Sequence, residues 1–168
     1  MTYSTTAADL LRQAVGRFNA VFTDAWRQRG KGMGFTEQQV VTLASIVEKE
    51  TGKADERPLI ASVFLNRLKR GMLLQSDPTT IYGLERFDGN LRKQDLSDPH
   101  PYNTYVHAGL PPGPIASPGK ESLQAALFPA ETDYLYFVSR NDGSHVFSRN
   151  LAEHTRAVME FQVRGKNR

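Results

Sequence analysis

The chain has 168 residues, of which 39% are hydrophobic and 23% are charged. These proportions are usual for a globular domain and exclude collagen-like, intrinsically disordered and membrane-spanning classes. The 21 lysines and arginines exceed the 18 acidic residues, for a net charge of +3. Because the basic residues are spread along the chain, they give little support to nucleic-acid binding. The lack of cysteine excludes disulfides, thiol nucleophiles and zinc–thiolate sites.

The N-terminus is polar, and no apolar run approaches the ~20 residues that span a bilayer. We therefore expect this stretch of chain to be soluble and to lack an anchor. It is then either an excised part of a longer protein or a naturally short relative.

The N-terminal region predicts one amphipathic helix. Apolar residues recur at helical spacing over residues 6–29, and the glycine-rich segment 30–34 predicts a flexible break. We expect residues 1–35 to form an N-terminal packing helix and linker. Residues 36–168 then form the main domain, in one compact unit with the first part.

Two further helices are expected next. Thr36 and Gln39 form a capping-box pattern that opens a helix over residues 36–51. Another helix is expected over residues 55–70, with Asp55 as its N-cap.

The middle of the chain, residues 72–119, has few periodic runs and many Pro, Gly, Asn, Asp and Tyr residues. A segment of this length without regular structure is typical of a functional surface. Inside it, Asp77 and Pro78 predict the N-cap and first position of a short helix that Gly83 ends.

The C-terminal part predicts a short helix over residues 121–128, a β-hairpin, and a closing helix over residues 150–162. Strands are expected at residues 134–138 and 145–148, joined by a turn at residues 141–144. The predicted fold class is therefore α+β, with helices packed around a central helix and a small antiparallel sheet near the C-terminus.

Glu50 is the candidate catalytic residue. On a helical wheel it falls between Leu43 and Ile46 at the edge of the apolar side, whereas Glu48 falls on the other flank. Desolvation beside apolar residues raises the pKa of a carboxyl group, which a general acid working near neutral pH needs. Periodicity alone leaves open the alternative that Glu50 reaches solvent or pairs with Arg67.

Other catalytic chemistries find no support. The four histidines lack the spacing of metal ligands, and we interpret them as surface or hydrogen-bonding residues: His100, His107, His145 and His154. The serines lack a nucleophile-elbow context, and the glycines form no phosphate-binding loop. We expect neither a metal nor a cofactor.

Polar and aromatic residues cluster at residues 75–80, 102–105 and 109–115. Tyrosine and asparagine side chains can stack on sugar faces and hydrogen-bond hydroxyl and N-acetyl groups. Each cluster alone is typical of turns, and Asp77 is more often a helix cap than a second catalytic carboxylate. Three such clusters in one domain favour a sugar-binding surface.

Several motifs follow one another along the chain: LASIVEKET at 43–51, ASVFLNRL at 61–68, LQSDPT at 74–79, YNTY at 102–105, GLPPG at 109–113 and IASPG at 115–119. In this order they resemble the YceG-like, or MltG, family of endolytic murein transglycosylases. The resemblance covers about residues 36–161 and identifies residues 36–168 as the catalytic domain.

The resemblance implies that Glu50, the second glutamate of the Glu-Lys-Glu-Thr run, is the catalytic acid and base. The implied reaction is non-hydrolytic cleavage of the β-1,4 bond between N-acetylmuramic acid and N-acetylglucosamine, leaving a 1,6-anhydro-muramyl end. One carboxyl suffices because the nucleophile is the O6 hydroxyl of the same ring. We predict that residues of the middle clusters orient the sugar: Gln75, Ser76, Asp77, Thr79, Tyr102, Asn103 and Tyr105.

The resemblance also implies peptidoglycan strands as substrate, peptidoglycan synthases as further partners, and the periplasmic face of the bacterial inner membrane as location. Family members carry an N-terminal membrane anchor and a LysM-like module, and neither is found in this sequence. We expect the lack of the module to lower activity, since remote binding energy positions the strand.

Three other functions stay open at this point. A non-catalytic peptidoglycan-binding module would keep its binding in Glu50→Gln and show no activity. A hydrolytic muramidase would use Asp77 as the partner of Glu50 and release reducing ends. A nucleic-acid binder, suggested by the basic charge alone, would show strongly salt-dependent DNA affinity.

Overall fold

The computed structural model describes residues 5–164. Within this range the helices are α1 (Ala7–Val21), α2 (Asp24–Gly32), α3 (Glu37–Glu50), α4 (Arg57–Lys69), α5 (Asp77–Gly83), α6 (Lys120–Leu127) and α7 (Leu151–Val158). Two strands form a hairpin between α6 and α7: β1 (Tyr136–Ser139) and β2 (His145–Ser148). Short turns of other helix types follow α5 and α7: η1 (Asp95–Ser97) and η2 (Met159–Arg164). The predicted α+β class is confirmed.

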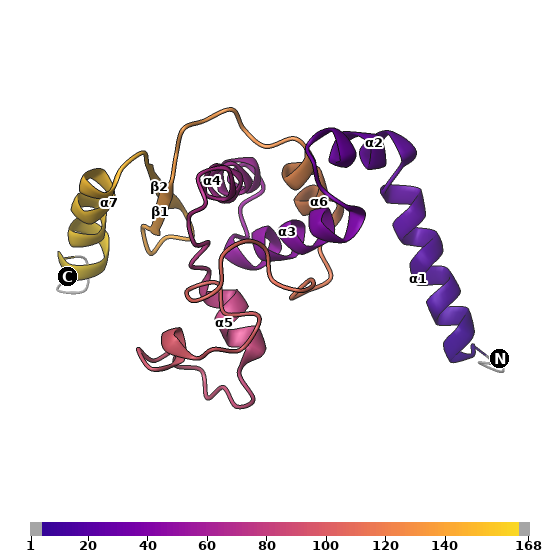
Figure 1. The fold of residues 1–168 in the computed structure, drawn as a ribbon, viewed down its shortest axis with the longest axis horizontal. Helices are drawn as coiled ribbons and strands as arrows, with labels where there is room; N and C mark the ends of the chain where they lie inside the picture. The colour runs from indigo at the N-terminus through magenta and orange to yellow at the C-terminus, as the bar shows by residue number, and fades with distance from the viewer. Residues whose placement is uncertain (1–4, 165–168) are drawn as a thin grey trace.

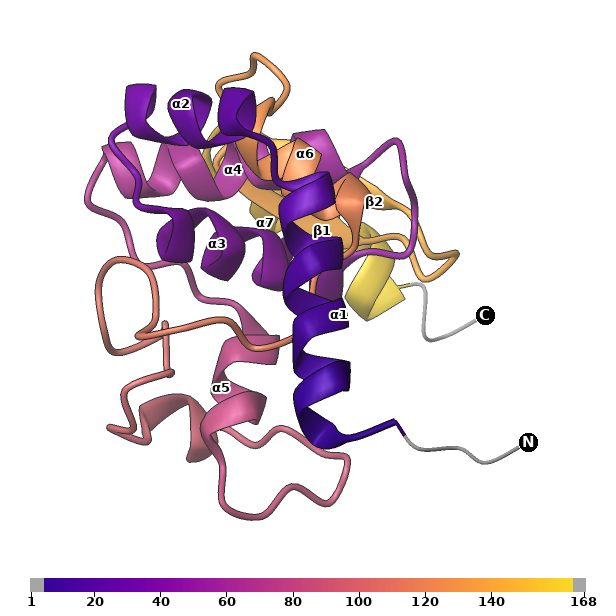
Figure 2. The ribbon, with the colours of Figure 1, turned by 90° about the vertical axis from the view of Figure 1, so that its right-hand side faces the viewer.

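Helix α3 lies at the centre of the molecule, with α4 and α6 packed against it and α5 on its other side (Figure 1). The hairpin and α7 lie at one end and α2 at the other, from which α1 projects away from the body (Figure 1). Seen from that end, α1 crosses in front of the other elements (Figure 2). No residue of α1 is buried. Between residues 5 and 164, no helix is both long and apolar enough to cross a bilayer.

The core is built by the facing sides of α3, α4 and α6. Its members are apolar and almost fully buried: Phe22, Val40, Leu43, Ala44, Ile46, Val47, Ile60, Ala61, Phe64, Leu65, Leu74, Ile115, Leu123, Ala125, Ala126 and Leu127. Helix α3 is therefore held on two sides, which fixes the direction of the side chains at its C-terminal end.

The hairpin pairs Phe137 with Phe147 and Ser139 with His145 in antiparallel register. Its turn uses left-handed backbone at Asn141 and Gly143, with φ of 67° and 82°, as Asn and Gly favour in such turns. The predicted turn at residues 141–144 is confirmed. The first strand begins at Tyr136 rather than at residue 134 as predicted.

The prediction of one helix over residues 6–29 is wrong. The helix is interrupted at Phe22 and Thr23. Phe22 is fully buried there, and the Thr23 hydroxyl caps α2 by accepting a hydrogen bond from the backbone N–H of Trp26. Helix α2 then runs through the glycines that predicted a flexible break, up to Gly32. Gly30 is buried there, and a Cβ at this position would lie 3.1 Å from Val40 Cγ2, so this glycine permits close packing of α2 on α3.

The predicted caps of two other helices are also wrong. Glu56, not Asp55, precedes α4, and its carboxylate binds His145 instead of the helix end. Ser76, not Asp77, precedes α5, and its hydroxyl is bound to Glu50. In both cases the residue that precedes the helix uses its side chain in a tertiary contact and does not cap the helix.

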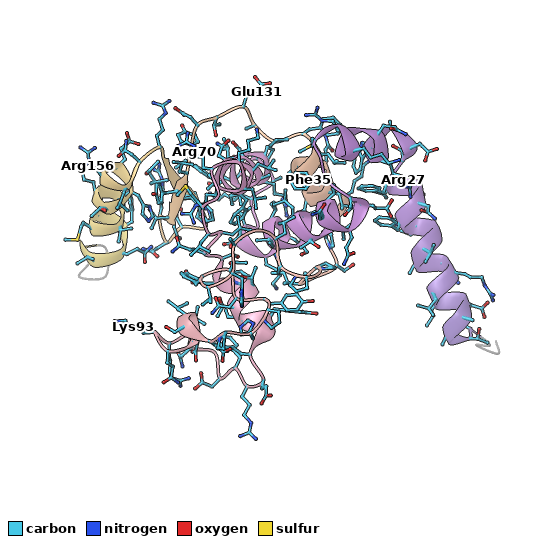
Figure 3. All side chains as sticks on the ribbon, viewed as in Figure 1. Arg27, Phe35, Arg70, Lys93, Glu131 and Arg156 are labelled. Carbon is cyan, nitrogen blue, oxygen red and sulfur yellow. The ribbon has the colours of Figure 1, made fainter. Side chains whose placement is uncertain are left out.

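The remaining boundaries shift by a few residues. Helix α6 begins one residue earlier than predicted, after Gly119. The closing helix begins at Leu151 behind the Asn150 N-cap and widens into η2 after Val158, where a regular helix was predicted to residue 162. The segment between α5 and α6 carries no longer element than η1, in agreement with its predicted irregularity. Lys93 extends outward from this segment (Figure 3).

Candidate active site

Glu50 is the last residue of α3, and its side chain is half-buried. Its Oε1 accepts a hydrogen bond of 2.5 Å from Ser76 Oγ, at the start of α5. The following residue, Thr51, is extended and ends the helix. Glu50 therefore lies where α3 meets the irregular middle segment. Its position is set by the C-terminal end of α3 and the N-terminal end of α5.

The pKa of Glu50 is raised to about 7, mainly by burial, and the negative charge of Asp77 acts in the same direction. The hydrogen bond from Ser76 and the positive charge of Arg67 act against this rise. Because desolvation prevails, Glu50 holds a proton near neutral pH and can also give it up, as a general acid and base must. The described ion pairs include none between Glu50 and Arg67, so the alternative of a simple salt bridge is wrong.

Glu50 lines a pocket of about 280 Å³ whose walls come from α3, α4, α5, β1, α7 and the middle segment. The lining residues are Glu50, Arg67, Leu74, Gln75, Asp77, Tyr105, Phe137 and His154. Three residues predicted to contact sugar, Gln75, Asp77 and Tyr105, thus share one pocket with the candidate acid. A fourth, Ser76, touches Glu50 itself.

Asp77 and Tyr105 are held together across the pocket. Tyr105 Oη donates to Asp77 Oδ1 at 2.6 Å. Burial, and the bond to Asp77, raise the pKa of Tyr105, so its hydroxyl stays a donor. The pair fixes the Asp77 carboxylate in the pocket wall, and its negative charge bears on Glu50.

Arg67 of α4 anchors another part of the pocket wall. Its guanidinium donates to the main-chain oxygens of Leu135 at 2.7 Å and Leu74 at 2.9 Å, and to Gln75 Oε1 at 3.2 Å. Gln75 itself has a left-handed backbone with φ of 53°, a conformation that non-glycine residues adopt rarely. Arg67 therefore joins the strand region to the start of α5 and fixes the geometry around Glu50.

Thr79 and Asn103 are fully buried and lie outside the lining of this pocket. Thr79 Oγ1 bonds Ser76 O and Thr104 Oγ1. Asn103 Nδ2 donates to three main-chain oxygens, including that of Asp98 at 2.7 Å, and its Oδ1 accepts from Thr80 and Tyr105. Their polar atoms are satisfied by the protein, so both residues support the loop instead of facing the pocket.

Tyr102 is half-buried and packs against Tyr82, with ring centroids 4.8 Å apart. It is not among the residues that line the Glu50 pocket. The structure therefore brings residues 74–77 and Tyr105 to Glu50 and leaves Tyr102 outside this pocket.

The sequence missed three lining residues, Leu74, Phe137 and His154. Leu74 and Phe137 belong to apolar patterns that predict only core or strand. His154 was interpreted as a surface or hydrogen-bonding residue; in the structure its ring is half-buried, so it does not lie free on the surface, and Nδ1 is enclosed without a partner among the described residues. Only the packing of α7 on the hairpin brings it to the pocket, and no local signal reports that contact.

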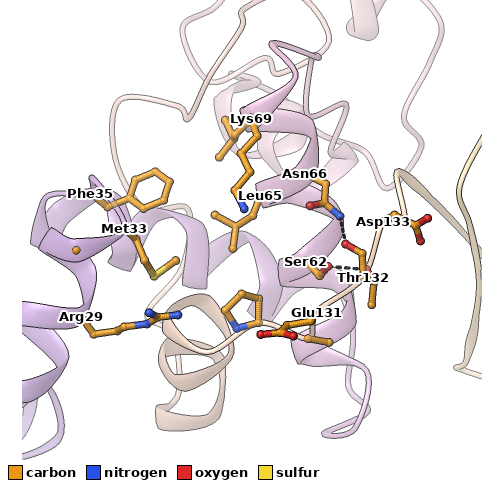
Figure 4. A pocket seen from close by; sticks show the side chains of 14 residues that line it. Arg29, Met33, Phe35, Ser62, Leu65, Asn66, Lys69, Glu131, Thr132 and Asp133 are labelled. Atoms are coloured by element: carbon orange, nitrogen blue, oxygen red, sulfur yellow. Dashed lines mark hydrogen bonds between the residues drawn. The ribbon is translucent and has the colours of Figure 1, made fainter.

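A larger pocket, of about 1050 Å³, lies between α2, α4 and the segment that follows α6 (Figure 4). Its polar groups are largely satisfied by one another: Ser62 Oγ and Asn66 Nδ2 both bond Thr132. Of its two acids, Glu131 is exposed, and Asp133 is paired with Arg149 at 2.7 Å. Among the residues that line this pocket there is no buried acid comparable to Glu50.

The Glu50 carboxyl, with its raised pKa and its bond from the Ser76 hydroxyl, can give and take a proton near neutral pH. The model of the YceG-like family matches residues 1–160 of this chain. The chain belongs to this family. The match starts well before residue 36, so the relationship extends over α1 and α2, beyond the motifs that revealed it.

The chain is 37% identical over 163 residues to an endolytic murein transglycosylase of Bacillus subtilis, covering 97% of this chain and 45% of the relative. It is 36% identical over 136 residues to an endolytic murein transglycosylase of Streptococcus pneumoniae, covering 77% of this chain and 25% of the relative. A crystal structure of a YceG-like protein from Listeria monocytogenes superposes with a TM-score of 0.79 at 36% identity. That match covers 93% of this chain and 50% of the Listeria chain. The chain thus spans half or less of these relatives.

Proposed function

We propose that this chain carries the catalytic site of an endolytic peptidoglycan lytic transglycosylase, with Glu50 as its acid and base. The observation that carries the proposal is the Glu50 carboxyl, which burial keeps protonated near neutral pH inside a polar pocket. The names of the Bacillus and Streptococcus relatives support the same activity.

In the proposed reaction, Glu50 donates its proton to the oxygen of the β-1,4 bond between N-acetylmuramic acid and N-acetylglucosamine. The bond from the muramyl C1 to that oxygen breaks, and C1 develops oxocarbenium character. The Glu50 carboxylate then takes the proton of the muramyl O6 hydroxyl as O6 attacks C1. The new C1–O6 bond closes the anhydro ring, and Glu50 ends protonated as it began.

The residues around Glu50 suit the two halves of this cycle. The Ser76 hydroxyl donates to Oε1 and so favours the carboxylate formed in the first step. The Asp77 charge acts in the opposite sense and favours the protonated form that starts the cycle. Ser76 lowers the pKa of Glu50 and Asp77 raises it, so together they leave Glu50 able both to donate and to accept a proton.

We assign sugar contacts to Gln75, Asp77 and Tyr105, which line the pocket. Thr79 and Asn103 act indirectly by holding the loop that carries Ser76 and Tyr105. Tyr102, beside the exposed Tyr82, suits a more distant sugar unit, because paired aromatic rings offer a stacking surface. The substrate is then the glycan strand on the outer side of the bacterial inner membrane, in its nascent form, close to the synthases that extend it.

A hydrolytic muramidase is the second candidate, because Asp77 shares the pocket with Glu50. The experiment is digestion of purified peptidoglycan with the native chain and with Glu50→Gln, followed by mass spectrometry. We expect anhydro-muramyl ends that are absent with Glu50→Gln and retained with Glu48→Gln as the matched control. Reducing ends in their place would establish the muramidase, and products that persist in Glu50→Gln would remove Glu50 from the mechanism.

A further inference from the structure

The C-terminal helix reaches the Glu50 pocket through one side chain. Helix α7 packs on both strands of the hairpin, and this contact makes His154 part of the pocket lining together with Glu50, Arg67 and Phe137. None of the sugar contacts assigned above comes from α7.

The His154 ring is held in place by stacking. It lies on the Tyr136 ring with centroids 5.1 Å apart and planes inclined by 20°. The same Tyr136 ring receives the guanidinium carbon of Arg67 at 5.0 Å from its centroid. Because main-chain oxygens hold Arg67, the ring orientation of His154 is fixed by rigid neighbours.

The two ring nitrogens of His154 differ in accessibility. Nδ1 is enclosed by protein and has no hydrogen-bond partner among the described residues. Nε2 is not enclosed in this way and has no protein partner in the described part of the chain, so it is the nitrogen that a ligand can reach. A buried N–H without an acceptor costs more than an unpaired lone pair, which places the proton of the neutral ring on Nε2. Burial, and the charge of Arg67, lower the pKa of His154 and keep the ring neutral.

Several donors of this pocket are already used within the protein, and among the described residues Gln75 Nε2 and Arg67 Nη2 stay without a partner. Tyr105 donates to Asp77, and the Arg67 Nε and Nη1 donors go to main-chain oxygens and Gln75. A glycan brings acceptor oxygens, above all the N-acetyl carbonyls, which cannot donate and need a donor from the protein. We propose that His154 is a further substrate-binding residue of this pocket, donating Nε2–H to an acceptor oxygen of the glycan. This inference rests on the proposed function.

The test measures binding, separate from turnover. Glu50→Gln serves as an uncleaving background, and isothermal titration with a tetrasaccharide of alternating N-acetylglucosamine and N-acetylmuramic acid gives Kd. His154→Phe keeps a ring for stacking on Tyr136 and removes both nitrogens. His154→Gln restores an amide donor near the Nε2 position. Thr155→Ala, at the next, exposed position of α7, is the matched control.

We expect His154→Phe to weaken binding by about tenfold, the effect of one lost hydrogen bond. His154→Gln should recover most of the loss, and Thr155→Ala should bind like the background. Equal affinity in His154→Phe and the background would overturn the inference and leave the proposed function intact. A background protein that binds no tetrasaccharide, with a native chain that forms no anhydro ends, would overturn both. If His154→Phe unfolds early, His154→Leu takes its place: a loss near tenfold supports the donor, and affinity within twofold of the background refutes it.

Discussion

Glu48 and Glu50 lie two residues apart on α3, yet their carboxyl pKa values are shifted in opposite directions. Glu48 Oε2 accepts from Ser122 Oγ at 2.6 Å and from the Gly119 N–H at 3.1 Å, and these bonds lower its pKa. Glu50 is desolvated, and its pKa is raised. Because residues two apart point to different faces of a helix, one turn carries both a structural carboxylate and an acid that keeps its proton.

Glu50→Gln should stabilise the fold at alkaline pH. The pKa of Glu50 rises from 4.5 to about 7 on folding, so between these values the folded protein keeps a proton that the unfolded chain has lost. Stability therefore falls as the pH rises from 4.5 to 7 and remains reduced above 7. Glutamine removes this cost, up to about 3 kcal/mol. Thermal unfolding should show a higher Tm for the variant at pH 8 and little difference at pH 4.

Glu48→Gln is the matched control, with the opposite sign. Its lowered pKa gives stability that is present above the unfolded value and is lost as the pH falls through the folded value. The substitution should cost about 1–2 kcal/mol at pH 7, where it weakens two partly buried hydrogen bonds. A Glu50→Gln variant less stable than the native chain at pH 8 would contradict the buried-acid interpretation.

Ser76→Ala should move the alkaline limb of the activity profile to higher pH. The Ser76 bond lowers the pKa of Glu50, so its loss lets the acid stay protonated further into the alkaline range. Turnover should also fall by about tenfold, because the carboxylate formed after proton donation loses its donor. Initial rates of anhydro-product release across pH 5–9 measure both effects. Ser62→Ala removes another buried hydroxyl, away from Glu50, and should leave the limb in place.

Asp77→Asn should move the same limb to lower pH. The negative charge of Asp77 raises the pKa of Glu50, and asparagine removes that charge while keeping a partner for Tyr105. Anhydro products should persist in this variant, since the transglycosylase reaction needs one carboxyl. Complete loss of turnover, with a native product that has reducing ends, would instead make Asp77 the second carboxylate of a muramidase.

Local patterning predicted the parts of the fold that local interactions determine. The Thr36–Gln39 capping box, the apolar side of α3 and the Asn141–Gly143 turn occur as predicted. The predictions of helix boundaries and caps were wrong where contacts between residues distant in the sequence determine the structure. Phe22 is drawn into the core and breaks a helix that its own periodicity would continue.

The candidate site follows the same division. The angle of Glu50 on its helix is a local property and predicted its desolvation, but the resemblance of the Glu-Lys-Glu-Thr run was needed to single it out as the acid. The sequence could not show which residues contact Glu50. Ser76 and Asp77 lie in a pattern typical of a helix cap, and their contacts in the pocket depend on where α5 meets α3. Asn103 was predicted to contact sugar, but its amide donates hydrogen bonds to main-chain oxygens of its own loop.

Asn103→Ala should destabilise the protein without acting as the loss of a sugar contact. The buried amide donates to three carbonyls and accepts from Thr80 Oγ1 and the Tyr105 N–H. Its removal leaves buried polar groups unpaired, at a cost of about 2–3 kcal/mol. We expect a lower urea midpoint for unfolding. Tetrasaccharide affinity measured well below that midpoint should change less than threefold, and a larger loss with unchanged stability would place Asn103 in contact with sugar.

Glu56→Gln should lower both stability and turnover, because Glu56 connects the residue after the candidate acid to the hairpin. Its Oε1 accepts from the His145 N–H at 2.9 Å, its Oε2 meets His145 Nδ1 at 2.6 Å, and Thr51 Oγ1 donates to Oε2 at 3.5 Å. Burial raises the pKa of Glu56, but together the bonds and charge of His145 outweigh it, and the net shift is downward.

The stability from Glu56 is therefore present above its unfolded pKa and is lost as the pH falls through the folded value. At pH 7 the variant should lose about 2 kcal/mol, since a buried charged acceptor is replaced by a neutral amide. Turnover should fall, because Thr51 ends α3 directly after Glu50 and loses a bond to Glu56. Tetrasaccharide affinity should stay unchanged, because of the described hairpin residues only Phe137 lines the pocket. Thermal unfolding and initial rates, with the exposed neighbour Asp55→Asn as control, measure both. Turnover unchanged in a destabilised Glu56→Gln would show that this buried pair supports the fold alone and does not position Glu50.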